Sequence, residues 1–410
     1  MHPQRATLHN ELHARPSLYF AAPAHLHHYA FLDADGACDR LIARLARDLG
    51  ETSDLEVAQG VLTLEDMVLK WERHTEFFTL TLLVPVQPDT ETWPAPPPLF
   101  AEIIEAHREQ VINATLLRVE DEVNVDGDLT GFGFRNPAGS IIGGGDATVW
   151  SDFRLTEDGV NHLLIVNHHL SDYRLGRMTR RLLEIETYRM MASLALPLAK
   201  ELSGEMRQFE QELAALSDRN AAAEETDSRP LLRDITALSA RMVNSSAGAR
   251  VRFSATDAYS KIVFTRIEEL RETRAGDSQR FGLFILRRFQ PTVRYCAAID
   301  RRQSSLEQSV AHLSDLLRTR AQVEIEEQNA VMLKSLNERT SSQLKIQKAV
   351  EGLSIIVISY YILSLFKLSL EGLDAVGLGM EPRQAAAIVA PLGILIIGGL
   401  SWRIWKVRKH

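Results

Sequence analysis

The chain has 410 residues, of which 45% are hydrophobic and 24% are charged, as in an ordinary globular protein. Its formal net charge of −8 argues against a nucleic-acid-binding protein, because such proteins carry a basic face. The two cysteines, Cys38 and Cys296, are far apart and predict a reducing compartment rather than a disulfide framework. The length is enough for roughly two domains and a membrane segment.

Residues 1–172 have the mixed pattern of an α/β (α+β) domain. Apolar runs predict strands at residues 27–32, 67–71, 77–84, 111–119, 140–150 and 159–170. Helices are predicted at residues 36–49 and 99–108, with an irregular proline-rich loop at 88–98. We expect an antiparallel or mixed sheet covered by a few helices. The first residues lack the apolar core of a signal peptide, so the domain is expected in the cytosol.

Residues 173–348 change to helical spacing and are expected to form a domain of long helices. Helices are predicted at residues 175–220, 230–243, 255–274 and 281–289. Pro197 should kink the first of these, because a proline within a helix removes a backbone hydrogen bond. A turn is expected at residues 244–248, between the second and the third.

A long stalk helix is predicted at residues 291–366, beginning at Pro291, since the first turn of a helix needs no proline amide. Within it, a four-three spacing typical of a coiled-coil seam is formed by Leu306, Val310, Leu313 and Leu317. Packing of this seam against copies of the chain is favoured, because a thin stalk gains most by burying its apolar stripe. A long helix hairpin within one chain is the alternative.

Two apolar stretches near the end of the sequence predict a transmembrane hairpin. The first span is expected at residues 349–370 and the second at 385–405, since crossing a bilayer takes about 20 apolar residues. Residues 371–384 form the connecting loop and 406–410 a basic tail. Basic residues precede the first span and follow the second. By the positive-inside rule we therefore expect both termini in the cytoplasm and the protein in a bacterial inner membrane.

One face of the first span carries Tyr360, Ser364 and Lys367 at positions i, i+4 and i+7. Polar faces in a membrane turn towards protein or water, so this face is expected to line a pore or a contact between subunits. Lys367 would repel cations if it pointed inward, or it extends outward to the interface. The connecting loop contains three acidic residues, Glu371, Asp374 and Glu381. In an oligomer they could form acidic rings around a pore, and the alternative is a solvated acidic loop.

Three strings of residues resemble an uncharacterised bacterial family of membrane-anchored proteins, a domain of unknown function. They are LHNELHARP at residues 8–16, WERHTEF at 71–77 and RLLEIETYRMMASLALP at 181–197. The resemblance extends over nearly the whole chain and implies a membrane anchor without implying an activity.

The order of the predicted parts is similar to the CorA family of divalent-cation channels: a cytosolic α/β domain, long helices, and a stalk that enters a two-span hairpin. Those channels are pentamers whose first spans line the pore, so the resemblance implies a homo-oligomer, a pentamer by preference. The sequence departs from the family at its Gly-Met-Asn signature, which follows the first span. The nearest match here is Gly379-Met380-Glu381, close to the second span, so magnesium selectivity is not implied.

Histidines gather near the start of the chain, where six of the 13 fall within the first 28 residues. His9 and His13 are four apart and would share a helix face, and His168 could supply a further ligand for a divalent cation. A closed metal site needs three or four ligands, so the alternative is a polar segment that docks onto the domain. No other cofactor is indicated.

Two charged segments admit both a functional and a structural interpretation. Residues 71–77 hold two carboxylates, an arginine and a histidine, which suit an acid–base or cation-sensing site, or else a charge-paired hairpin. The charged stretch at residues 177–189 predicts ion pairing with a neighbouring helix or subunit, with a regulatory cation site on Glu184 as the alternative. The glycine-rich stretches at 131–133 and 143–146 lack the spacing of a phosphate loop and predict turns.

No nucleophile or oxyanion hole is recognisable, so an enzyme is not expected and no catalytic residue is assigned. The leading hypothesis is a cation channel or transporter of CorA-like architecture with a cytosolic regulatory domain. The alternative is a membrane-anchored scaffold or sensor, in which the hairpin tethers and oligomerises the cytosolic domain. The expected partners are the lipid bilayer and further copies of the chain.

Overall fold

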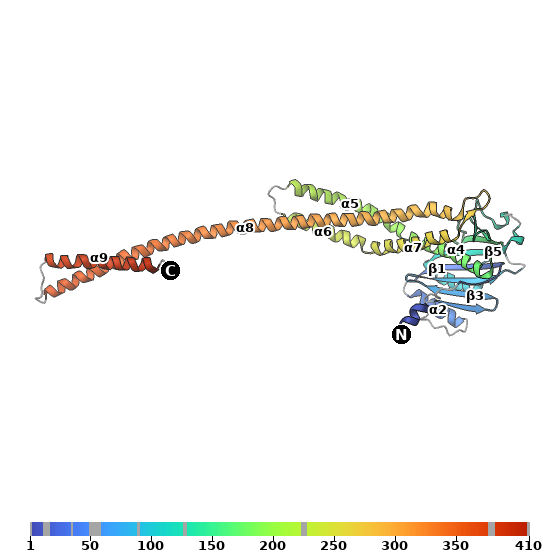
Figure 1. Ribbon diagram of the computed structural model, residues 1–410, viewed down its shortest axis with the longest axis horizontal. Helices are drawn as coiled ribbons and strands as arrows, with labels where there is room; N and C mark the ends of the chain where they lie inside the picture. The colour runs from blue at the N-terminus through green and yellow to red at the C-terminus, as the bar shows by residue number, and fades with distance from the viewer. Residues whose placement is uncertain are drawn as a thin grey trace. The chain divides into compact units, whose positions relative to one another are not determined.

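The computed structural model describes residues 2–10, 17–33, 36–48, 59–87, 91–125, 129–222, 228–375 and 382–407. The chain divides into two compact units (Figure 1). The first comprises Met1–Glu224 and Leu231–Ser314, and the second comprises Glu225–Pro230 and Asp315–His410.

The first unit contains a mixed sheet with the strand order β2-β3-β4-β1-β5-β8-β7-β6-β9 among the described residues. Its strands are β1 (Ala24–Leu32), β2 (Gln59–Leu64), β3 (Met67–Arg73), β4 (Phe77–Pro85), β5 (Val111–Asp121), β6 (Ala138–Ile142), β7 (Ala147–Ser151), β8 (Asn161–Asn167) and β9 (Thr273–Arg274). β5 and β8 pair in parallel, and the other neighbours pair antiparallel. The prediction of a mixed α/β domain is therefore confirmed.

The segment predicted as one strand at residues 140–150 is two strands, β6 and β7. Gly143, Gly144 and Gly145 turn the chain between them with φ angles of 67°, 83° and 112°. Only glycine adopts such angles without strain, so three in succession form a turn rather than a continued strand. The strands β2 and β9 were not predicted.

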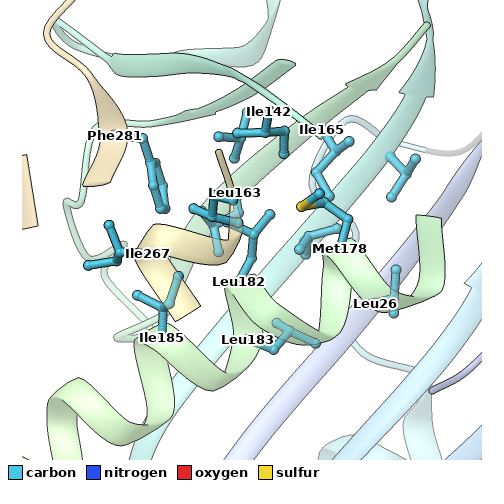
Figure 2. Close-up of a cluster of buried hydrophobic side chains, with 14 of the residues drawn as sticks. Leu26, Ile142, Leu163, Ile165, Met178, Leu182, Leu183, Ile185, Ile267 and Phe281 are labelled. Atoms are coloured by element: carbon cyan, nitrogen blue, oxygen red, sulfur yellow. The ribbon is translucent and has the colours of Figure 1, made fainter. Parts of the chain in front are cut away.

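Helices cover both faces of the sheet. Successive side chains of a strand point to opposite faces, so the apolar side chains on each face need a separate cover. One face packs against α4 (Asp172–Ser193), α7 (Ala249–Glu269) and the start of α8 (Phe281–Ala375). Figure 2 shows Leu182 of α4 close to Leu163 of β8 and Ile267 of α7. The other face packs against α2 (Ala37–Asp48) and α3 (Pro98–Ala106), with Phe31 and Phe78 stacked 5.0 Å apart.

The remaining elements of the first unit are short or lie beyond the sheet. They are α1 (Arg5–Asn10), α5 (Ala195–Ala222), α6 (Arg229–Ser246), η2 (Arg108–Gln110), η3 (Glu122–Asn124) and η4 (Thr130–Phe132). The kink predicted at Pro197 is present as a break between α4 and α5, because α4 ends at Ser193, four residues earlier. A proline ring clashes with the carbonyl at that position.

α8 corrects the prediction of a short helix at residues 281–289 followed by a new helix from Pro291. It is one continuous helix in which Pro291 is internal. Proline removes a single hydrogen bond there, near the start of the helix. Phe281, Ile285 and Phe289 are buried in the core before Pro291, so their packing keeps both parts in one helix.

The coiled-coil seam of α8 is already covered within the single chain. Leu306, Val310 and Leu313 are buried in the first unit, and Leu317 is buried as well. This agrees with the intramolecular alternative rather than with packing of the seam on other copies. From residue 325 to residue 350 every side chain of α8 is exposed.

Candidate functional site

A cavity of about 50 Å³ lies between the sheet and α4 in the first unit. Alternate residues of three strands line one side of it: His28 of β1, Lys70 and Glu72 of β3, and Thr79 and Thr81 of β4. Residues of α4 line the other side, including Thr179, Arg180, Glu184 and Thr187. The lining therefore combines these polar groups with apolar side chains such as Phe20, Leu26 and Leu183, which belong to the apolar core on the same faces of the sheet and of α4 (Figure 2).

His28 joins the sheet to α4 across the cavity. Its Nδ1 lies 2.8 Å from the hydroxyl of Thr81, and its Nε2 lies 2.9 Å from the hydroxyl of Thr187. Burial lowers the pKa of His28 to about 3, with a further contribution from the positive charges of Lys70 and His74. The imidazole is therefore neutral at physiological pH and too weak a base for acid–base catalysis.

Lys70 places an ammonium group at the cavity while being almost completely buried. Its side chain is 5% exposed, and its Nζ lies 3.2 Å from the carboxylate of Glu72, two residues along the same face of β3. Burial lowers the pKa of Lys70, and Glu72 opposes this change. The pair presents a cation and a carboxylate side by side at the wall of the cavity.

A chain of ion pairs connects the cavity to α7. Arg180 lies 2.7 Å from Glu184, which also accepts a hydrogen bond from Arg266 of α7. Arg266 in turn contacts Glu269 at 2.9 Å, and Arg181 of α4 contacts the same carboxylate at 2.9 Å. The predicted ion pairing between helices is confirmed. Two guanidinium groups around Glu184 leave little attraction there for a cation.

The segment at residues 71–77 forms the β3–β4 hairpin, and its charged groups have partners on several elements. Arg73 donates to Asp39 of α2, and Glu76 accepts two hydrogen bonds from Arg252 of α7 at 2.7 and 2.9 Å. The His74 ring stacks on Phe77 with centroids 4.1 Å apart. This is the charge-paired hairpin that we expected as the structural interpretation, with Glu72 contributing to the cavity in addition.

Thr179 brings a buried hydroxyl to the lining of the cavity. Its side chain is buried, and its hydroxyl has no hydrogen-bond partner among the described residues. An unsatisfied buried polar group costs about 1–3 kcal/mol, a cost that a ligand or water with a matching polar atom removes. With Lys70 across the cavity, the arrangement suits binding of a small polar molecule.

The residues predicted to bind a metal are not brought together within the described part of the chain. His9 is exposed in α1, and His13 lies outside the described residues. His168 is already engaged, with its Nδ1 3.1 Å from the carboxylate of Glu122 and its Nε2 2.9 Å from the hydroxyl of Thr148. No group of three metal-ligating side chains occurs in the ranges that the structure describes. Because His13 is not among them, metal binding by this set stays a prediction.

The residues predicted for a pore or subunit contact lie near the end of α8. Tyr360 and Ser364 are exposed, and the Nζ of Lys367 lies 3.7 Å from the carboxylate of Glu371. α8 continues to Ala375, so Glu371 and Asp374 belong to this helix rather than to a loop; Glu381 lies outside the described residues.

α8 also contains a stretch that is long and apolar enough to cross a membrane, and 6% of it is buried. A further helix, α9 (Pro382–Val407), follows. The two helices approach closely at Gly393, because a Cβ atom at that position would lie 2.9 Å from a methyl carbon of Leu363. Ser359, four residues before Leu363, is buried as well.

Most residues of the cavity were missed by the sequence reasoning. Thr79 and Thr81 interrupt the apolar face of β4, which is a signal that the pattern contains. Thr179 and Thr187 lie eight residues apart on α4 and carry no comparable signal. Their place in the cavity depends on the packing of α4 against β1. The contact of His28 with Thr187, for example, joins residues that are 159 positions apart in the sequence.

Comparison with known proteins adds a family without an activity. A family model described as "Protein of unknown function (DUF3422)" matches residues 1–410. No curated protein matches the sequence. The family match supports the expected resemblance to an uncharacterised family over the whole chain.

Proposed function

The chain belongs to the DUF3422 family, and we propose that it is a membrane-anchored sensor whose α/β domain binds a small polar molecule in the cavity beside α4. The observation that carries this proposal is the buried hydroxyl of Thr179, which has no hydrogen-bond partner among the described residues and belongs to the lining of a cavity that also includes Lys70. Protein interiors satisfy nearly all their buried polar groups, so a cavity with an open hydrogen-bonding position is suited to a ligand.

The size and charge of the cavity limit the ligand. A volume of about 50 Å³ admits a molecule of a few heavy atoms. The two cations of the lining, Lys70 and Arg180, lie next to the two carboxylates Glu72 and Glu184. The lining is therefore balanced in charge, which favours a neutral or zwitterionic molecule rather than a bare ion.

The membrane anchor in this proposal is a hairpin of the last part of α8 with α9. Large apolar side chains are exposed along this part of α8, including Leu353, Ile356, Ile358, Leu365 and Leu368. Contiguous apolar surface of this kind is rare on soluble monomers and is favourable in a bilayer. Gly393 supports the hairpin, since small residues allow membrane helices to approach closely. In this proposal both termini lie in the cytoplasm of a bacterial cell, since basic residues precede the first span and follow the second.

Self-association is the second part of the arrangement that we propose. The stalk portion of α8 carries exposed apolar side chains at Val331, Met332, Leu333, Leu336, Leu344 and Ile346. A solvated helix gains by burying such residues between copies of itself. We favour a pentamer, as in the CorA resemblance, and native mass spectrometry of the detergent-purified protein measures the number of subunits.

Ligand binding is tested by thermal unfolding of the full chain in detergent, against a panel of small neutral and zwitterionic metabolites. At least one compound should raise the Tm of the wild-type protein. The variants Thr179→Val and Lys70→Met should lose this response, whereas the exposed substitution Lys261→Met on α7 should keep it. A panel that leaves the wild-type Tm unchanged, or a shift that both cavity variants retain, contradicts the proposal.

Cation conduction is the second candidate function, and the pairing of Lys367 with Glu371 favours it. At 3.7 Å the carboxylate offsets the positive charge that would otherwise repel cations at the end of the span. The polar positions Tyr360 and Ser364 would then face the pore. Flux into liposomes that falls on Ser364→Leu would support conduction, whereas an equal flux from both proteins, or none from the wild type, would oppose it.

A further inference from the structure

A second site lies on the surface of the first unit, where α4, the β6–β7 turn and the end of α7 meet. It is a groove of about 210 Å³, and four of its lining residues are arginines. They are Arg174, Arg177 and Arg181 of α4 and Arg271, which follows α7. We propose that this groove binds a phosphomonoester dianion, separately from the small polar molecule in the cavity.

The charges around the groove are unequal. Arg174 lies 2.5 Å from Asp146, and Arg181 lies 2.9 Å from Glu269. Arg177 and Arg271 are exposed and make no ion pair with any residue that the structure describes. Four arginines therefore line the groove beside two carboxylates, and one of these, Glu269, also pairs with Arg266 of α7 at 2.9 Å. The positive charge that is in excess suits a phosphomonoester, which carries about −1.5 to −2 at neutral pH.

The geometry directs these charges to one place. Residues 174, 177 and 181 are three and four apart, so they project from a single face of α4. Arg271 comes from a different element and lines the same groove. Guanidinium groups recognise phosphate oxygens through paired hydrogen bonds. Two arginines from different elements, without carboxylate partners among the described residues, therefore suit a phosphate in the groove that both line.

The position of Arg174 also favours an anion over a neutral ligand. Arg174 lies in the first turn of α4, where the helix dipole is positive and a cationic side chain is unfavourable. An anion bound there interacts favourably with both the dipole and the arginines. Gly143 in the β6–β7 turn accepts a hydrogen bond from Arg174 at 3.0 Å, which holds that arginine at the groove.

The site differs from a glycine-rich phosphate loop. The amide of Gly143 donates to the carbonyl of Leu270, and that of Gly145 donates to the carbonyl of Ile142, so neither points to a ligand. Recognition would come from side chains, chiefly Arg177 and Arg271. The shared chemistry fits either a soluble phosphate ester or the headgroup of an anionic lipid.

The test uses the full chain in nonionic detergent, titrated calorimetrically in one arm with glycerol 3-phosphate and in the other with short-chain phosphatidic acid. Saturable binding is expected in at least one arm, and binding to the lipid alone identifies a headgroup as the source. The double variant Arg177→Gln/Arg271→Gln should weaken binding at least tenfold. Both arginines are exposed, so the fold should persist, which the unchanged Tm of the variant confirms.

The matched control removes the same charge elsewhere, in the double variant Arg287→Gln/Arg301→Gln on the exposed side of α8. It should bind as the wild type does. Absence of saturable binding in both arms overturns the proposal. So does equal weakening by the two double variants, since that result would reflect net charge rather than a site. These variants leave Thr179 and Lys70 of the cavity unchanged. A failure of phosphate binding in the groove is therefore distinguishable from a failure of small-molecule binding in the cavity beside α4.

Discussion

At the scale of single residues, His28 shows how a buried polar group couples stability to pH. Its pKa is lowered to about 3 in the folded protein by burial, below the ordinary 6.5 of the unfolded chain. At pH values under 6.5 the unfolded chain therefore binds a proton that the folded protein does not. His28 consequently disfavours folding as the pH falls from 6.5 towards 3, at up to about 1.4 kcal/mol per pH unit.

The expected outcome is a fall in Tm between pH 7 and pH 5 that is smaller in His28→Gln than in the wild type. The substitution removes the titrating group while retaining a side chain that can bond to Thr81 and Thr187. Circular dichroism of the full chain in detergent measures the two falls. Since His25 and His27, with pKa values lowered to about 4, titrate in the same direction, part of the dependence should persist. Equal falls in both proteins would contradict the assignment to His28.

Gly176 is a residue whose importance depends on space rather than on chemistry. A Cβ atom at this position of α4 would lie 1.8 Å from the carbonyl oxygen of Leu18. Gly176→Ala should therefore lower the unfolding free energy by more than about 1 kcal/mol, despite the better helix propensity of alanine. The control is Gly204→Ala on α5, where an added Cβ atom would meet nothing within 4 Å apart from its own stretch of helix, and a gain of up to about 1 kcal/mol is expected. Thermal unfolding compares the two, and similar shifts would refute the packing argument.

At the scale of elements, the ion pairs between α4 and α7 should behave as a unit. Glu184 bonds to both Arg180 and Arg266, and all three are less than one-third exposed. Glu184→Gln should destabilise the protein by about 1–3 kcal/mol, because the arginines lose a charged acceptor. The double variant Glu184→Gln/Arg266→Gln should lose less than the sum of the single variants. Chemical unfolding of the four proteins measures the coupling, and strictly additive losses would show that the pair is independent.

The elements that the sequence predicted well are those whose pattern is local. Alternation and continuous apolar runs located β1, β3, β4 and β5, and leucines at spacing four located α2. Pro291 misled the prediction of α8, because the packing of Phe281 and Phe289 outweighs one missing hydrogen bond. The cavity could not be predicted, since it needs His28 and Thr187 in contact across 159 residues of sequence. Of its charged pair, Glu72 lies in the charged segment that the sequence singled out, and Lys70 does not.

At the scale of the whole molecule, the apolar part of α8 is suited to an apolar medium, whereas the first unit is suited to water. The exposed apolar side chains of α8 between residues 353 and 368 have no cover within the described chain. The first unit, by contrast, buries a continuous core between its sheet and its helices. This contrast is the basis of our proposal that the apolar part of α8 enters a bilayer while the α/β domain stays in water.

The full chain should therefore pellet with bacterial membranes and resist alkaline extraction, whereas a chain ending at Lys348 should remain in the supernatant. The shortened chain keeps Phe281, Ile285 and Phe289, so its α/β core should unfold with a Tm close to that of the full chain. Substituting Ile358→Arg in the full chain places a charge in the apolar stretch, which disfavours insertion by about 2.5–3.5 kcal/mol at the centre of a span. This variant should be extracted more readily than the exposed control Ser342→Arg. If the shortened chain still pellets, the membrane contact lies in the first unit rather than in α8. If the full chain stays soluble, the apolar stretch of α8 is covered by contacts between copies of the chain instead of by lipid.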